Sequence, residues 1–202
     1  MPIVRTVLPE RSKLRLDRAL DQFSCLREKH SRWMNIRPSS IVRKCIFYPH
    51  PLYNVRLLDL LAGKPFALTL KRVAWVCFLR DSANRLACAE QSTVAGAQKY
   101  VRLTEGQLTK KVFALIARTK KDARIRQEGF ELRAIRIESL HFICLWLRST
   151  SRTEYFVPIT PLGAAITAGR WISRKELAHA LSKEANRVRD AHDRVSSLLQ
   201  RA

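Results

Sequence analysis

The chain lacks any hydrophobic run long enough to cross a membrane as a helix. Its longest strongly apolar, uncharged segment is Val73–Leu79, whereas a membrane-spanning helix needs about 20 residues. The first residues, MPIVRTVLPERSK, contain neither an apolar stretch nor a cleavage pattern of the kind that directs secretion. We therefore expect a cytoplasmic protein that does not bind membranes.

The chain also has few glycines and prolines, and its cysteines do not form the pattern of a disulfide-bonded protein. Six Gly and eight Pro in 202 residues exclude a collagen-like or Gly-rich low-complexity chain. The five cysteines are odd in number, and Cys77 and Cys144 lie inside apolar runs, which is typical of reduced, buried thiols rather than a disulfide framework. Hydrophobic residues make up 47% of the chain, which is enough for a core and excludes a fully disordered protein.

Acidic residues are few. The chain has 17 Asp and Glu against 38 Lys and Arg, so its formal net charge is +21, and no acidic segment offsets it. A basic surface attracts phosphates, and the counterions that it releases supply affinity whatever the base sequence. We expect a nucleic-acid partner, with duplex DNA favoured over RNA. An anionic membrane surface, an acidic protein partner or a plainly solvated surface are the alternatives.

Recognisable catalytic and metal-binding motifs are missing as well. The sequence contains no G-x-S-x-G, no Gly-rich phosphate loop and no H-E-x-x-H. Cys25 and His30 share the spacing of Cys45 and His50, so a zinc site made of two Cys and two His has to be considered. Five residues along a helix turn through about 500°, however, so that the side chains of such a pair point roughly 140° apart. We expect no enzyme activity, no cofactor and no metal.

Hydrophobic periodicity predicts an α+β fold. An N-terminal strand–helix–helix module is followed by a mixed α/β domain with a long C-terminal helix. The predicted helices cover residues 12–33, 38–48, 55–62, 83–99, 107–126 and a C-terminal segment opened by the capping box Ser173-x-x-Glu176. The predicted strands are Ile3–Leu8, a segment within Phe66–Leu79, Phe130–Ile137 and Tyr155–Ile159.

Two questions of organisation stay open in the sequence. Leu140–Leu147 is apolar all round, so periodicity does not separate a buried strand from a buried helix. Pro49–Asn54 is the best candidate for a hinge, which would separate a module at residues 1–50 from a domain at residues 64–202.

The N-terminal module has a recognisable order of segments. IVRTVLPE, RLDRALDQF and IRPSSIVRKCIFY, all within residues 3–48, resemble a ribbon-helix-helix DNA-binding domain. The resemblance implies a homodimer, in which the strands of two chains pair into a ribbon that enters the major groove. It also implies a second helix whose N-terminal amides point at a backbone phosphate.

The resemblance assigns roles to five polar residues of this module. If Val4, Thr6 and Leu8 face the core, the alternation of side chains along a strand turns Arg5 outward, where its guanidinium could make a bidentate contact with guanine. Ser39 and Ser40, with their backbone amides, would hold a phosphate at the helix start. Arg43 and Lys44 would add positive charge close by.

A second basic region lies in the middle of the chain. The segment Lys110–Arg126 holds seven basic residues and one acid, Asp122. On a helix Lys111, Arg118 and Lys121 form a stripe that can follow phosphates, and Lys110 adds a further charge. A solvated helix face is the alternative. The aromatic residues of Phe130–Ile159 lie among Ile, Leu and Val, which indicates a core rather than a stacking platform.

The C-terminal helix carries an apolar stripe. Its members follow each other at spacings of four, seven, seven and four residues: Leu177, Leu181, Val188, Val195 and Leu199. This spacing favours packing on the helix's own domain, with a partner helix in a dimer as the alternative.

Together these features predict a DNA-binding protein, a transcriptional or plasmid and mobile-element regulator. It would act through phosphate contacts and the N-terminal strand, with residues 64–202 as a regulatory domain or a domain that binds a protein partner. The alternatives are an RNA-associated or ribosome-type structural protein, or a basic subunit of a larger assembly. A nucleic-acid enzyme whose metal site the sequence does not reveal is a third class.

Overall fold

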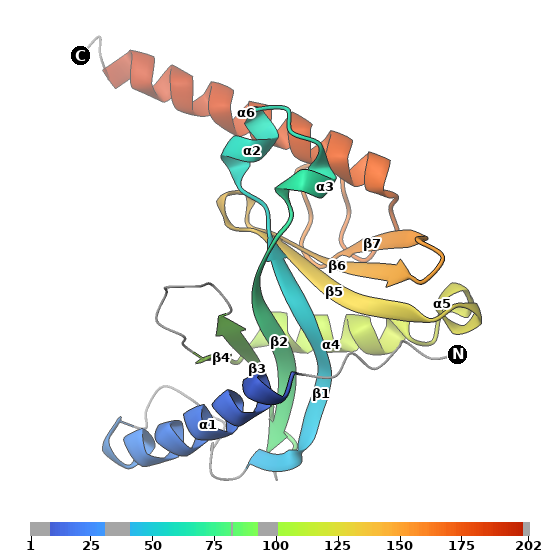
Figure 1. The fold of residues 1–202 in the computed structure, drawn as a ribbon. Coiled ribbons are helices and arrows are strands. Elements are labelled where there is room, and N and C mark those ends of the chain that lie inside the picture. Colours follow the sequence, from blue (N-terminus) through green and yellow to red (C-terminus); the bar gives the residue numbers. More distant parts are fainter. Residues whose placement is uncertain (1–8, 31–40, 82, 93–100, 200–202) are drawn as a thin grey trace.

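In the computed structural model a mixed β-sheet forms the middle layer, and helices cover both of its faces (Figure 1). The structure describes residues 9–30, 41–81, 83–92 and 101–199. The described strands are β1 (Ile41–Asn54), β2 (Lys71–Asp81), β3 (Leu86–Ser92), β4 (Val101–Thr104), β5 (Phe130–Ile137), β6 (Phe142–Ser149) and β7 (Glu154–Pro158). The described helices are α1 (Glu10–His30), α2 (Leu57–Leu61), α3 (Phe66–Thr69), α4 (Gln107–Thr119), α5 (Ala123–Gln127) and α6 (Arg174–Leu199). The α+β content and the long C-terminal helix confirm the predicted fold class.

The two strands at the centre of the sheet, β1 and β5, are paired over only a short length. The strand order is β4-β3-β2-β1-β5-β6-β7, and neighbours are antiparallel except for β1 and β5. These two parallel strands pair only over Leu52–Asn54 and Ala134–Arg136. From this short pairing, β1 and β2 run away from β5 and β6, and α4 lies across both halves of the sheet (Figure 1). A cavity lies between the sheet and α4, lined by residues of both.

Helix α6 covers one face of β5, β6 and β7, together with α2 and α3. Leu177 and Leu181 are fully buried and pack against Ile135 and Trp146 in one hydrophobic cluster. The predicted capping box starts the helix: the Ser173 amide donates to the Glu176 carboxylate over 2.7 Å, and the Glu176 amide donates to Ser173 Oγ over 3.2 Å. The first half of α6 therefore packs on its own domain, as predicted.

Helix α1 covers the same face at the other half of the sheet. Leu16 and Leu20 pack on Trp75 and Leu79 of β2 and on the small Ala87 of β3. Helices α4 and α5 cover the opposite face. Their buried residues Ile116 and Ile125 share a cluster with alternate residues of the same strands: Phe78, Leu132, Leu145, Leu147 and Val157. Because side chains alternate along a strand, each strand contributes to the cores on both faces.

Two predicted helices are wrong. The segment predicted as a helix over 38–48 is strand β1 from Ile41 onward, and the expected hinge Pro49–Asn54 lies inside that strand. Prolines occur in strands mainly at bulges and unpaired edges. Both conditions hold here, because the register shifts around Tyr48, whose φ is +49°, and β5 joins β1 only from Leu52. The Ala-rich segment predicted as a helix over 83–99 contains β3, Leu86–Ser92.

Other predicted segments agree with the structure or are modified by it. Strands β2, β5 and β7 match the predicted strands closely, and Leu140–Leu147 is resolved in favour of a strand, β6. The helix predicted over 107–126 is two helices, since the chain turns at Lys120 and Asp122 caps α5 through the Arg124 amide. The N-cap of α4 is Gly106.

The remaining expectations concern the ends of the chain and its helices. The predicted strand Ile3–Leu8 lies outside the described residues. Among the helices that the structure describes, none is both long enough and apolar enough to span a membrane.

Candidate nucleic-acid interface

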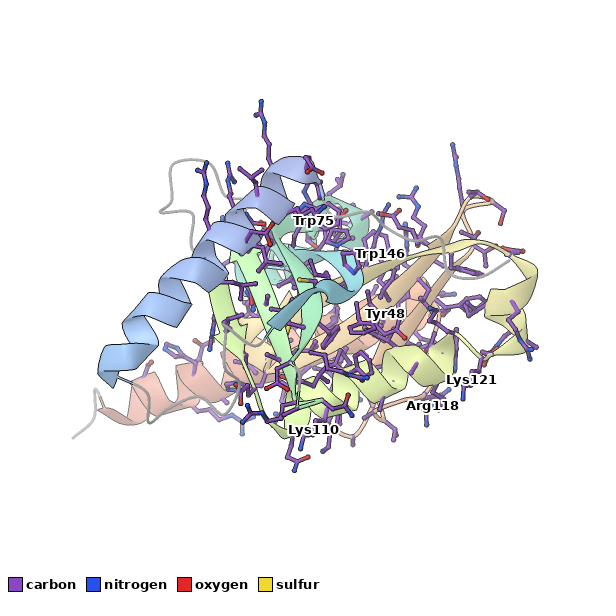
Figure 2. All side chains as sticks on the ribbon, turned by 90° about the horizontal axis from the view of Figure 1, so that it is seen from below. Tyr48, Trp75, Lys110, Arg118, Lys121 and Trp146 are labelled. Carbon is purple, nitrogen blue, oxygen red and sulfur yellow. The ribbon has the colours of Figure 1, made fainter. Side chains whose placement is uncertain are left out.

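The outer side of α4 carries a row of cations with no acid among them. No Asp or Glu occurs between Gln107 and Lys121. The buried side of α4 presents Thr109, Ile116 and Thr119 to the sheet. This fixes the exposed side, on which four basic side chains lie: Lys110, Lys111, Arg118 and Lys121. We call these four residues the α4 basic surface. Figure 2 shows Lys110, Arg118 and Lys121 spread along α4 and its following turn, on the side away from the sheet.

The four cations have no acidic partner in the described part of the chain. No hydrogen bond or ion pair joins any of them to a carboxylate. Lys111 and Arg118 are seven residues apart, so they point to nearly the same side of α4 and lie about 10 Å apart along its axis. Lys121 follows the end of the helix, where its amide donates to the Arg118 carbonyl over 3.0 Å. The predicted stripe is therefore present, with its last member on a turn.

A groove runs beside the α4 basic surface. It has a volume of about 320 Å³ and lies between α4 and the segment from Pro158 to Gly169, with Lys111 and Arg118 on one wall. Gly169 has φ of +78°, and a Cβ at this position would lie 3.0 Å from Arg118 Nη2. A glycine is favoured here because it adopts this left-handed conformation without strain. The segment can therefore pass close to the guanidinium.

Cations at the end of α4 and in α5 lie over aromatic rings. Lys120 Nζ is 4.7 Å from the centre of the Tyr48 ring, and Arg124 is 4.0 Å from that of Trp171. Arg124 also donates to Asp122 over 2.9 Å, which lowers the pKa of that carboxyl. Such cation–ring contacts hold cations in place at a protein surface. The sequence does not reveal them, because Tyr48 and Trp171 are distant from α4 along the chain.

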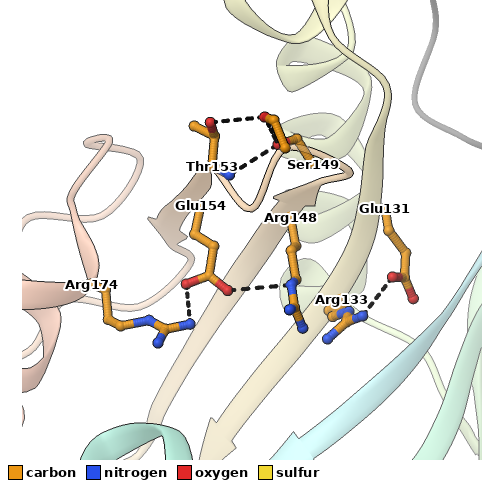
Figure 3. A network of polar contacts seen from close by, with 8 residues as sticks. Glu131, Arg133, Arg148, Ser149, Thr153, Glu154 and Arg174 are labelled. Carbon is orange, nitrogen blue, oxygen red and sulfur yellow. Dashed lines mark hydrogen bonds and ion pairs between the residues drawn. The ribbon is translucent and has the colours of Figure 1, made fainter.

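Arginines on the opposite face of the sheet are engaged by carboxylates. Figure 3 shows Glu154 between Arg148, at 3.7 Å, and Arg174, while Arg133 pairs with Glu131 at 2.6 Å. Arg133 also lies 4.6 Å from the centre of the Trp146 ring. The charge of this network is partly compensated within the fold. For the α4 basic surface, the residues that the structure describes supply no such carboxylates.

The structure brings together only some of the residues predicted to bind nucleic acid. Lys110, Lys111, Arg118 and Lys121 share one surface. Arg5, Ser39 and Ser40 lie outside the described residues.

Arg43 and Lys44 lie in strand β1, so their predicted place on a second helix is wrong. The ribbon strand expected near Arg5 is not described, and the resemblance of residues 3–48 to a ribbon-helix-helix domain stays a prediction.

Within residues 9–199 as far as they are described, no three His, Cys, Asp or Glu side chains are grouped to hold a metal ion. His50, one of the residues in the repeated Cys–His spacing, lies in β1 and is buried. The buried thiols of Cys77 and Cys144 have a raised pKa, because burial disfavours the thiolate.

Comparisons of the chain with protein-family models, with curated proteins and with solved structures find no match.

Proposed function

We propose that this protein binds duplex DNA, and that the α4 basic surface holds the phosphate backbone. The observation that carries the proposal is the row of four exposed cations along α4 and the turn that follows it, none of which has a carboxylate partner in the described residues. Cations already paired with carboxylates gain little from a phosphate. Unpaired cations release the counterions condensed on DNA when they bind it.

The groove beside α4 supports a backbone contact in particular. Lys111 and Arg118 stand on its wall, and its remaining lining is apolar or glycine: Ala114, Leu115, Pro158, Ile159, Ala168 and Gly169. An apolar floor below two cations suits a sugar–phosphate chain, because phosphates contact the cations while the sugars lie against carbon. Contacts of this kind position a protein on nucleic acid without reading its sequence.

Fluorescence anisotropy with a labelled duplex, a single strand of the same sequence and a double-stranded RNA tests the proposal. The key variant is Lys111→Ala/Arg118→Ala. Its matched control is Lys175→Ala/Lys183→Ala, which removes the same net charge from exposed positions of α6, on the other face of the sheet. At about 0.1 M salt, loss of two phosphate contacts weakens duplex binding by at least tenfold by counterion release, whereas the control changes it far less.

Two outcomes would overturn the proposal. Equal losses in the two variants would show that only the total charge of +21 matters. Tighter binding of RNA than of duplex DNA would favour an RNA-associated protein in its place.

A further inference from the structure

A second cavity lies between α4 and the sheet, where the strands splay apart. It has a volume of about 200 Å³. Its walls are mostly apolar, with Leu52 and Val76 from the sheet and Leu108 and Val112 from α4. An apolar cavity of about 150 Å³ is large enough for benzene. The volume therefore suits one aromatic ring with a short substituent, and it is too small for a nucleotide.

One polar group in the cavity wall has a hydrogen-bonding position to spare. His50 is 1% exposed, and its ring is stacked on Phe78 with ring centres 6.3 Å apart. Burial lowers the pKa of His50 to about 4, so its ring is neutral at pH 7. His50 Nδ1 lies 2.6 Å from the Tyr48 carbonyl oxygen and must donate its proton to it. Nε2 then carries a lone pair and accepts a hydrogen bond.

The charged residues of the wall favour an anion. Glu90 is held by Arg136 through two contacts, at 2.8 and 2.9 Å. Arg102 also lines the cavity, is exposed, and has no carboxylate partner in the part of the chain that the structure describes. An unpaired guanidinium beside an apolar cavity is suited to a ligand that has an apolar body and a carboxylate.

We propose that this cavity binds a small aromatic carboxylic acid, with its ring among the apolar side chains and its carboxylate on Arg102. A hydroxyl group on the ring donates to His50 Nε2. The site is separate from the α4 basic surface, which lies on the outer side of the same helix, so that its existence does not depend on DNA binding.

Ligand-observed NMR titrations of the full chain at pH 7 measure binding of benzoate, 4-hydroxybenzoate and the uncharged benzyl alcohol. In Arg102→Ala we expect benzoate affinity to fall by at least about tenfold through loss of a charge-assisted hydrogen bond, while benzyl alcohol binds as before. Val112→Phe fills the cavity and abolishes binding of all three. The control Arg72→Ala removes an exposed arginine of β2 that does not line the cavity, and it changes none of them.

The outcomes distinguish binding in the cavity from binding of the acid to other positive charges on the protein. Equal loss of benzoate binding in Arg102→Ala and Arg72→Ala would mean that the acid binds by overall charge, and would overturn the proposal. Binding that survives Val112→Phe in a variant with a wild-type circular dichroism spectrum and melting temperature would do the same. Failure of all three compounds to bind wild-type protein at millimolar concentration would refute it directly.

Discussion

Protonation of His50 couples the stability of the fold to pH. The imidazole is buried against Phe78 in the central strand β1. Burial lowers its pKa from 6.5 to about 4, although the hydrogen bond to Tyr48 opposes this shift. In the unfolded chain the ring takes up a proton near pH 6.5. The unfolded state therefore binds more protons between pH 6.5 and pH 4, and stability must fall as the pH is lowered through that window.

The size of the effect follows from the two pKa values. Each pKa unit corresponds to about 1.4 kcal/mol, so the full loss below pH 4 is about 3 kcal/mol. Between pH 7 and pH 5 the loss is about 2 kcal/mol by the same linkage relation. Asp81 and Asp122 also have lowered pKa values, because hydrogen bonds from Arg85 and Arg124 outweigh the opposing effect of burial. Their contribution to the free energy of unfolding is lost only at a pH below this window.

Urea unfolding at pH 7 and at pH 5, followed by tryptophan fluorescence, measures this loss. The comparison variant is His50→Gln, which does not titrate and retains an amide that can donate to the Tyr48 carbonyl. We expect the variant to be less stable at pH 7 but to lose about 2 kcal/mol less than the wild type on going to pH 5. Equal losses in the two proteins would refute a buried, neutral His50. The effects of other titrating groups on stability are the same in both proteins, so they cancel when the two losses are subtracted.

Further variants test the packing and the local geometry. Ser173→Ala removes the capping hydroxyl of α6 and lowers stability by about 1 kcal/mol in urea unfolding; no change would mean that the Glu176 carboxylate alone caps the helix. Ile116→Ala empties a fully buried position between α4 and the sheet and costs roughly 2–5 kcal/mol, measured in the same way; a smaller loss would place α4 loosely on the sheet. Gly169→Ala forces a side chain into a left-handed conformation and lowers stability by about 1 kcal/mol; a melting temperature equal to that of the wild type would contradict the positive φ.

The sequence predicts those parts of the fold that local patterns determine. Phe130–Ile137 and the core of β2 are runs of residues that favour strands, and Ser173-x-x-Glu176 is a local helix signal. The wrong predictions depend on distant partners. Ala87 and Ala89 have high helix propensity, yet they lie in β3, where they share a hydrophobic cluster with Leu16 and Leu20 of α1.

The same distinction applies to the candidate site. A count of charges along one helix is enough to find Lys110, Lys111 and Arg118. The groove is not predictable, because its second wall comes from residues 158–169. The ring below Lys120 belongs to Tyr48, in a segment that was predicted to be helical but forms a bulged strand.

The most direct test of DNA binding by the α4 basic surface is the salt dependence of duplex affinity. Four phosphate contacts give a slope of log K against log salt of about −3.6, or roughly a 150-fold loss between 50 and 200 mM salt. In Lys111→Ala/Arg118→Ala the slope should become shallower by about 1.8. In Lys175→Ala/Lys183→Ala it should stay as in the wild type. An unchanged slope in the first variant, or equal changes in both, would contradict the assignment of this surface to DNA.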